Sequence, residues 1–266
     1  MARSLAIAPV EERADDWVNR LSRCHATTRL LDLYMGDAWS QAKRLASTAR
    51  DSGFAPTLFV ASAGLGLRSI DELTPSYAAT FARGNLDTVA GTATDSEAWW
   101  SRLPHTPLGV HGDEQAVWVL SETYARAMRK DTESLDPGKA LVFGGAASTP
   151  ATVRVPSDRH LRKALGGTIT TLNMRMAIRW LELAGMGDIT AATVRRNWER
   201  WAQGARRIET FDRMPLTDDA VRQQIRRLRD ENKGLSKTAA LRALRASGIA
   251  CEQRRFSALF EEVRGS

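Results

Sequence analysis

Segment 58–81 places carboxylates and a tyrosine close behind a short apolar run. It reads LFVASAGLGLRSIDELTPSYAATF, in which Asp71 and Glu72 supply the carboxylates and Tyr77 a phenol. The first residues, 58–61, have the length and composition of a β-strand buried on both faces. Because ligands bind at the carboxyl ends of the strands in an open parallel sheet, we expect these polar side chains to lie at an active-site edge.

The turn that follows this expected strand is rich in small residues. Ser62, Gly64 and Gly66 allow the backbone to turn tightly, and we expect all three to line a substrate-binding site. The alternative is an ordinary strand-to-helix connection in which the glycines serve only the backbone geometry, because a Gly-x-Gly pattern is weak evidence of a site.

A second polar segment, 28–36, reads TRLLDLYMG and adds Asp32 and Tyr34 just ahead of an amphipathic helix expected over 37–50. We expect the carboxylate to join Asp71 and Glu72, and the phenol to contact the substrate. Packing of the tyrosine ring into the core is the alternative.

Familiar catalytic motifs are absent from the sequence. It contains no Walker loop, no dinucleotide-binding glycine fingerprint after a strand, no HExxH and no GxSxG. The four histidines share no metal-ligand spacing, and Cys24 and Cys251 lie far apart without a second pair. We therefore expect no metal site, no cofactor and no disulfide, and we expect both thiols to be buried.

An enzyme limited to carboxylates, hydroxyls and amides can still remove a base from a sugar. The oxocarbenium-like transition state needs a carboxylate that stabilises charge and orients water, and a pocket that holds the departing base. Asp32, Asp71 and Glu72 are the candidate catalytic residues, and Tyr34 and Tyr77 are the candidate contacts to an extruded base.

Apolar runs alternate with helical patterns in the first part of the chain. Strand-like runs occur at 57–61, 116–120, 140–143 and, more weakly, 152–155. Together with the helices between them they predict an α/β domain over residues 1–156, a three-layer arrangement in which helices cover both faces of a parallel sheet. The stretch 86–113 is expected to be irregular, with Trp99 and Trp100 as core anchors.

Residues 157–266 carry only helical patterns, and this part holds the excess of positive charge. From residue 195 onward there are 17 Lys and Arg against 10 Asp and Glu. Helices expected over 236–246 and 250–263, joined by Ser-Gly-Ile, have helix-turn-helix spacing. A basic cluster of this kind is typical of nucleic-acid binding, although a solvated helix face or any three-helix subdomain gives a similar pattern.

The residues expected to contact DNA lie on two of these helices and at their ends. Exposed positions early in the second helix suit base edges or phosphates, and the arginines of the preceding helix suit backbone phosphates. The candidates are Arg226, Arg227, Lys237, Gln253, Arg254 and Arg255, with Arg222, Arg229 and Lys233 as further phosphate contacts.

Several motifs resemble a known bacterial group. Leu33-Tyr34 leading into a helix, Ser-Ala-x-x-Gly-Leu at 62–67 and Pro-x-Tyr at 75–77 are similar to proteins related to the peroxide-stress protein YaaA and to domains associated with tRNA-guanine transglycosylases. The segments 165–179 and 250–260 also resemble pieces of such proteins. The resemblance implies a uracil-DNA-glycosylase-like α/β fold and a place among base-modification and phage-defence proteins.

Segment 165–179 reads LGGTITTLNMRMAIR, and its resemblance to these proteins implies that Asn173 contacts the substrate. The water-activating GQDPYH segment of true uracil-DNA glycosylases is absent, so their mechanism does not carry over. The leading hypothesis is a DNA glycosylase that excises a modified base, with phage DNA as partner, in anti-phage defence. The alternatives are a non-catalytic DNA-binding or nucleotide-sensing protein and, third, base exchange on tRNA.

No window approaches the roughly 18 uninterrupted apolar residues of a membrane span. The first ten residues also lack the pattern of a signal peptide. We therefore expect a cytoplasmic protein without a membrane partner.

Overall fold

A computed structural model describes residues 1–106, 114–208, 214–232 and 234–265, in two compact units, Met1–Arg207 and Ile208–Ser266. The division therefore falls 51 residues after the boundary at 156/157 that the sequence suggested, because the first helices beyond Pro156 pack with the α/β part. Lys233 lies outside the described residues.

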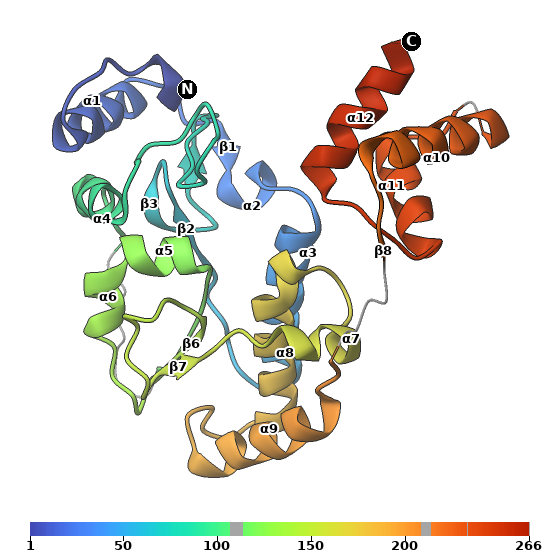
Figure 1. Cartoon of the computed structure of the whole chain (residues 1–266). Helices are drawn as coiled ribbons and strands as arrows, with labels where there is room; N and C mark the ends of the chain where they lie inside the picture. Colours follow the sequence, from blue (N-terminus) through green and yellow to red (C-terminus); the bar gives the residue numbers. More distant parts are fainter. Residues whose placement is uncertain (107–113, 209–213, 233, 266) are drawn as a thin grey trace. The chain divides into compact units, whose positions relative to one another are not determined.

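The first unit is a mixed α/β structure that contains a small parallel sheet (Figure 1). Its strands, in the order in which they pair, are β5 (Ala116–Leu120), β6 (Ala140–Gly144) and β7 (Arg154–Val155). Trp118 and Val142 pack into one apolar cluster, whereas Leu141 and Phe143 pack into another. Since side chains alternate along a strand, the sheet is buried on both faces, as the apolar runs predicted.

Different helices supply the two apolar clusters. The helices of the first cluster are α1 (Val10–Ser22), α4 (Ala93–Arg102) and α5 (Glu122–Ala127). The short α6 (Arg129–Glu133) follows Met128 of that cluster. The helices of the second cluster are α3 (Asp37–Asp51), α8 (Leu172–Ala184) and α9 (Ala192–Ala205). The tryptophans of the chain contribute to both, which fits their large buried area.

Short helical turns complete the first unit. They are η1 (Ala2–Ser4), α2 (Leu30–Leu33), η2 (Arg159–Leu161), α7 (Arg162–Leu165) and η3 (Ile169–Thr171). Every helix among the described residues is too short or too polar to cross a lipid bilayer.

The apolar run at 57–61 does not join the parallel sheet. It forms β2 (Phe59–Ser62), which pairs antiparallel with β3 (Gly66–Ser69) in a two-stranded hairpin. A parallel partner would need a crossover of a dozen or more residues, whereas only three residues separate these strands. A second antiparallel pair joins β1 (Thr28–Arg29) to β4 (Leu73–Thr74).

The stretch expected to be irregular, 86–113, contains α4. Thr92 accepts a hydrogen bond from the backbone of Asp95, whose carboxylate accepts one from the backbone of Thr92. This capping box starts the helix and was overlooked in the sequence. Trp99 and Trp100 are buried, so their prediction as core anchors is confirmed. Cys251 is buried, but Cys24 is exposed, against expectation.

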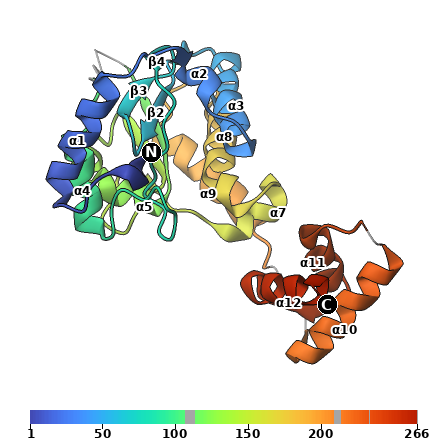
Figure 2. The same ribbon diagram turned by 90° about the horizontal axis from the view of Figure 1, so that it is seen from above.

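The second unit is a three-helix bundle (Figure 2). Its elements are β8 (Met214–Pro215), α10 (Asp218–Glu231), α11 (Lys237–Ala246), β9 (Ile249–Ala250) and α12 (Gln253–Gly265). Thr217 and Ser236 cap the first two helices through their hydroxyl oxygens, as is usual for these residues. Ile225, Leu244 and Phe256 form the centre of its own apolar core. The helices expected over 236–246 and 250–263 are confirmed as α11 and α12.

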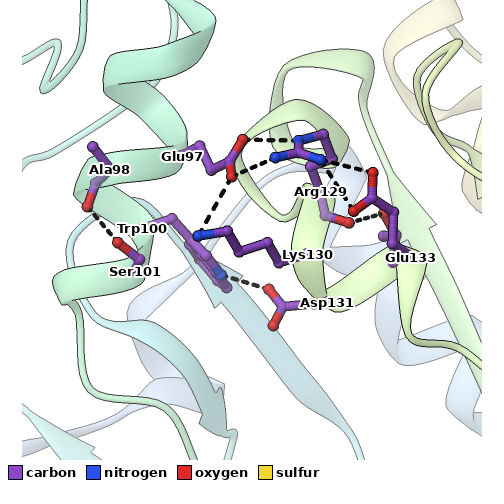
Figure 3. Close-up of polar contacts among 9 residues, drawn as sticks. Glu97, Ala98, Trp100, Ser101, Arg129, Lys130, Asp131 and Glu133 are labelled. Carbon is purple, nitrogen blue, oxygen red and sulfur yellow. Dashed lines mark hydrogen bonds and ion pairs between the residues drawn. The ribbon is translucent and has the colours of Figure 1, made fainter.

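A network of polar contacts joins α4 to α6 (Figure 3). The Glu97 carboxylate accepts hydrogen bonds of 2.9 Å from Nε and Nη2 of Arg129, and Lys130 Nζ lies 3.8 Å away. Arg129 also pairs with Glu133, and Trp100 Nε1 donates to Asp131 at 2.7 Å. Hydrogen bonds from Arg129 hold the pKa of Glu97 below its ordinary value against the opposing effect of burial.

We predict that Glu97→Gln lowers the melting temperature at pH 7 by about 2 °C, because a partly exposed ion pair contributes little. A carboxyl whose pKa is lowered in the folded state stabilises above its unfolded value, near 4.3, and this contribution is lost as the pH falls through the folded value. Thermal unfolding of wild type and variant should therefore converge below pH 4. Glu12→Gln, on an exposed part of α1, is the control, and an equal loss in both variants would contradict the prediction.

Candidate functional site

The turn between β2 and β3 is held by side chains from three other elements. The carbonyl of Ala63 accepts a hydrogen bond of 2.7 Å from Trp99 Nε1 on α4, and that of Gly64 accepts one of 2.7 Å from Trp17 Nε1 on α1. The backbone N–H of Ala63 donates to the Tyr124 hydroxyl on α5 at 3.3 Å. Because a buried peptide group without a partner is costly, these contacts fix the position of the turn.

Tyr34, Ser62 and Tyr77, which we call the tyrosine–serine cluster, share their hydroxyls. The Tyr77 hydroxyl lies 2.5 Å from Ser62 Oγ and 2.5 Å from the Tyr34 hydroxyl. Ser62 Oγ also accepts from the backbone N–H groups of Gly64 and Leu65, at 3.1 and 3.2 Å. The structure thus brings five of the six predicted substrate contacts together at the hairpin turn, since Gly66 pairs with Ser62.

The glycines of this turn allow close packing. A Cβ on Gly64 would lie 2.5 Å from the ring of Tyr77, and one on Gly66 would lie 2.3 Å from the carbonyl oxygen of Pro104. Gly66 also has φ of +78°, a conformation that favours glycine. Backbone geometry therefore accounts for Gly66, whereas the close approach of the Tyr77 ring accounts for Gly64.

Burial reinforces the neutral form of Tyr77 and Tyr124. It raises the pKa of Tyr77 above the ordinary value, and the neighbouring Tyr34 reinforces this shift. Burial likewise raises the pKa of Tyr124 to about 12. Both phenols are therefore neutral at physiological pH and act as hydrogen-bonding groups. Tyr124 is not among the residues that the sequence analysis predicts for the site. The one feature that could have indicated it is its position four residues after the end of β5.

The three candidate carboxylates lie on neighbouring segments at the open end of the hairpin. The N–H groups of Leu30 and Leu31, at the start of α2, donate to the carbonyls of Glu72 and Ile70, each at 3.0 Å. Asp32 follows directly on α2. Since Ser69 pairs with Phe59 and Gly66 with Ser62, this end lies about 10 Å along the strands from the turn.

Glu72 is the most constrained of the three carboxylates. Burial disfavours its charged form, but hydrogen bonds from the Thr106 hydroxyl (2.6 Å) and the Ser69 N–H (3.0 Å), together with Arg68, hold its pKa below the ordinary value. Asp71 is exposed and pairs with Arg29 at 2.5 Å. Asp32 is exposed, and its side chain has no hydrogen bond or ion pair to a described residue.

Asn173 lies apart from these groups, at the carboxyl ends of β5 and β6. Its Nδ2 donates to the carbonyl of Leu120 at 3.2 Å, and a Cβ on Gly144 would lie 2.1 Å from that nitrogen. Its Oδ1 is buried without a hydrogen-bond partner among the described residues. The sheet edge at which ligands bind in parallel sheets is therefore marked by Asn173 rather than by segment 58–81.

The candidate DNA contacts of the second unit fall into two groups. Arg227 pairs with Glu231, Lys237 pairs with Glu261, and Arg255 donates to Asp218 and to the carbonyl of Leu216. Arg226, Gln253 and Arg254 are exposed, and their side chains have no ion pair or hydrogen bond with other residues of the described chain. These three remain available to a ligand.

The basic excess of the last quarter is shared between the two units. Residues 195–207, with five arginines against one glutamate, belong to α9 and its C-terminal end in the first unit. The second unit, 208–266, has 12 Lys and Arg against nine Asp and Glu. Each unit therefore carries part of the charge that the sequence appeared to concentrate in one helical region.

Comparisons with protein-family models, with curated proteins and with solved structures gave no match for this chain. The resemblance to the YaaA-related group stays a prediction from the sequence motifs.

We predict that Tyr77→Phe lowers the free energy of unfolding by about 1–2 kcal/mol, because it removes both hydrogen bonds of a buried hydroxyl. Tyr34→Phe removes only one of them and is the matched control, with a smaller loss. Urea denaturation measures both. Equal stability of the Tyr77 variant and wild type would contradict a structural role of the tyrosine–serine cluster.

Proposed function

We propose that this protein binds DNA through its second unit and that its first unit acts on a nucleobase. The observation that favours DNA binding is the exposure of Arg226, Gln253 and Arg254 on a three-helix unit, since their side chains make no hydrogen bond or ion pair with a described residue. Gln253 and Arg254 are the first residues of α12, which follows α11 after a short turn. In helix-turn-helix proteins this position meets base edges and phosphates.

Ion pairs distinguish the arginines that are available to bind DNA from those that hold the helices of the second unit together. A guanidinium that already pairs with a carboxylate has fewer free N–H groups and less unbalanced charge for a phosphate than an unpaired one. We therefore assign DNA contact to Arg226 and Arg254 first. Arg255, with its bonds to Asp218 and Leu216, serves mainly to hold α12 against the start of α10.

We predict that Arg226→Gln combined with Arg254→Gln weakens binding to duplex DNA of many sequences and lowers the log–log salt slope by about 2, since each phosphate contact releases counterions. Arg227→Gln, adjacent on α10 but paired with Glu231, is the control and should change the slope less. Fluorescence anisotropy over a range of salt concentrations measures this. Unchanged affinity and slope in the double variant would mean that Arg226 and Arg254 belong to a solvated basic face and do not contact DNA.

For the first unit we propose excision of a modified base from DNA, such as phage DNA in anti-phage defence, by a glycosylase-like three-layer α/β domain. The observation that supports this proposal is that backbone hydrogen bonds between α2 and loop 70–72 bring the segments of Asp32, Asp71 and Glu72 together. Water would attack the sugar C1′ while the base leaves with the bonding electrons and takes up a proton. A carboxylate held ionised, such as Glu72, would stabilise the positive charge that develops on the sugar.

We predict that Glu72→Gln lowers the rate of base release by at least about 100-fold per folded molecule, because the charge that stabilises the transition state is lost. Alkali-labile breaks in modified phage DNA measure the reaction, and circular dichroism measures folding. Asp71→Asn and Asp32→Asn, at exposed positions, are the companion variants.

Full activity in all three variants would contradict the assignment of the carboxylates. A gel shift without strand breaks would indicate that the protein binds DNA but does not excise a base. Incorporation of a free base into tRNA without abasic sites would instead point to base exchange.

A further inference from the structure

A pocket of about 290 Å³ in the first unit lies between α3, α7, α8 and α9. Its lining includes three arginines, Arg44, Arg175 and Arg179, against one carboxylate, Glu182. The candidate carboxylates and the tyrosine–serine cluster do not belong to it.

Local contacts hold Arg175 in place. Arg175 donates from Nε to the Thr171 hydroxyl at 3.4 Å, and its Nη2 lies 3.5 Å from Asp37. Its guanidinium rests against the backbone of Gly167, where an added Cβ would lie 2.3 Å from Nε. The head group is therefore oriented before any ligand arrives, which lowers the entropy lost on binding.

Two of the arginines retain unused donors. Arg179 pairs with Glu182 through Nη1 at 3.0 Å, but its Nε is buried and has no acceptor within the described chain. Arg44 is exposed, and its side chain makes no ion pair or hydrogen bond with a described residue. That nitrogen is closed to solvent, but Nη2 of Arg179 and the Arg44 guanidinium make no hydrogen bond with a described residue, so they suit an anion with several acceptor oxygens.

The remaining wall is apolar. Leu165, Ile178 and Trp201 line the pocket, and the Arg179 guanidinium lies 5.1 Å from the centre of the Trp201 ring. The pocket volume is near the lower end of the roughly 300–1,000 Å³ of small-molecule sites, which suits one small ligand. An inorganic ion alone would leave the apolar wall unused.

We propose that this pocket binds a small organic phosphate of about the size of a mononucleotide. The phosphate oxygens accept from Arg44, Arg175 and Arg179, and the organic part lies against the apolar wall. The proposal does not depend on DNA binding or on base excision, because neither involves these residues.

Isothermal titration of the full chain with AMP, adenosine and inorganic phosphate tests it. We expect saturable binding of AMP, weaker binding of inorganic phosphate and no binding of adenosine. Arg44→Gln should weaken AMP binding by about tenfold, as expected for the loss of one charge-assisted contact. Arg50→Gln is the matched control, since Arg50 is exposed on the same helix but does not line the pocket.

Glu182→Gln gives a readout that a purely structural role would not produce. It removes the one lining carboxylate and should tighten AMP binding several-fold. No saturable binding of AMP, or equal affinity in the Arg44 variant and wild type, would overturn the proposal. Inorganic phosphate binding as tightly as AMP would overturn the assignment of an organic ligand.

Discussion

The hydrogen bonds from two tryptophans to the turn of the β2–β3 hairpin are the contacts on which the first unit most depends. Trp17 and Trp99 come from different helices, and their indole N–H groups meet the carbonyls of consecutive residues, Ala63 and Gly64. Each tryptophan also fills the apolar cluster that covers one face of the parallel sheet. The same side chains therefore position the hairpin and close the core, and neither role can be removed alone.

The hairpin in turn positions the polar groups. Its turn carries Ser62, which meets Tyr77 and through it Tyr34, and its open end leads into loop 70–72. The loop is attached to α2 by backbone hydrogen bonds, so the positions of the neighbouring carboxylates do not depend on their own side chains. This arrangement explains why we expect a carboxylate at Asp71 or Asp32 to be replaceable without unfolding the loop.

Positive charge is organised differently in the two units. In the second unit Lys237 and Arg255 are engaged in ion pairs between helices and Arg227 in one within α10, which leaves Arg226, Gln253 and Arg254 available. In the first unit Arg175 and Arg179 are held around a pocket by hydroxyl, carboxylate and indole groups. An exposed guanidinium suits a long, salt-dependent phosphate backbone, whereas an oriented one suits a small ligand.

The sequence by itself determined the elements whose evidence is local. The apolar runs of β5 and β6 and the helices expected over 236–246 and 250–263 all reappear in the structure. Only the tertiary structure decided how β2 pairs, because one apolar run fits a parallel or an antiparallel partner equally well. It also decided the burial of the Tyr77 hydroxyl and the gathering of Arg44, Arg175 and Arg179 around one pocket. Helical spacing alone places Arg175 and Arg179 on one face of α8, but the placement of Arg44 at the same pocket and the contacts between Ser62, Tyr34 and Tyr77 join separate segments that no periodicity encodes.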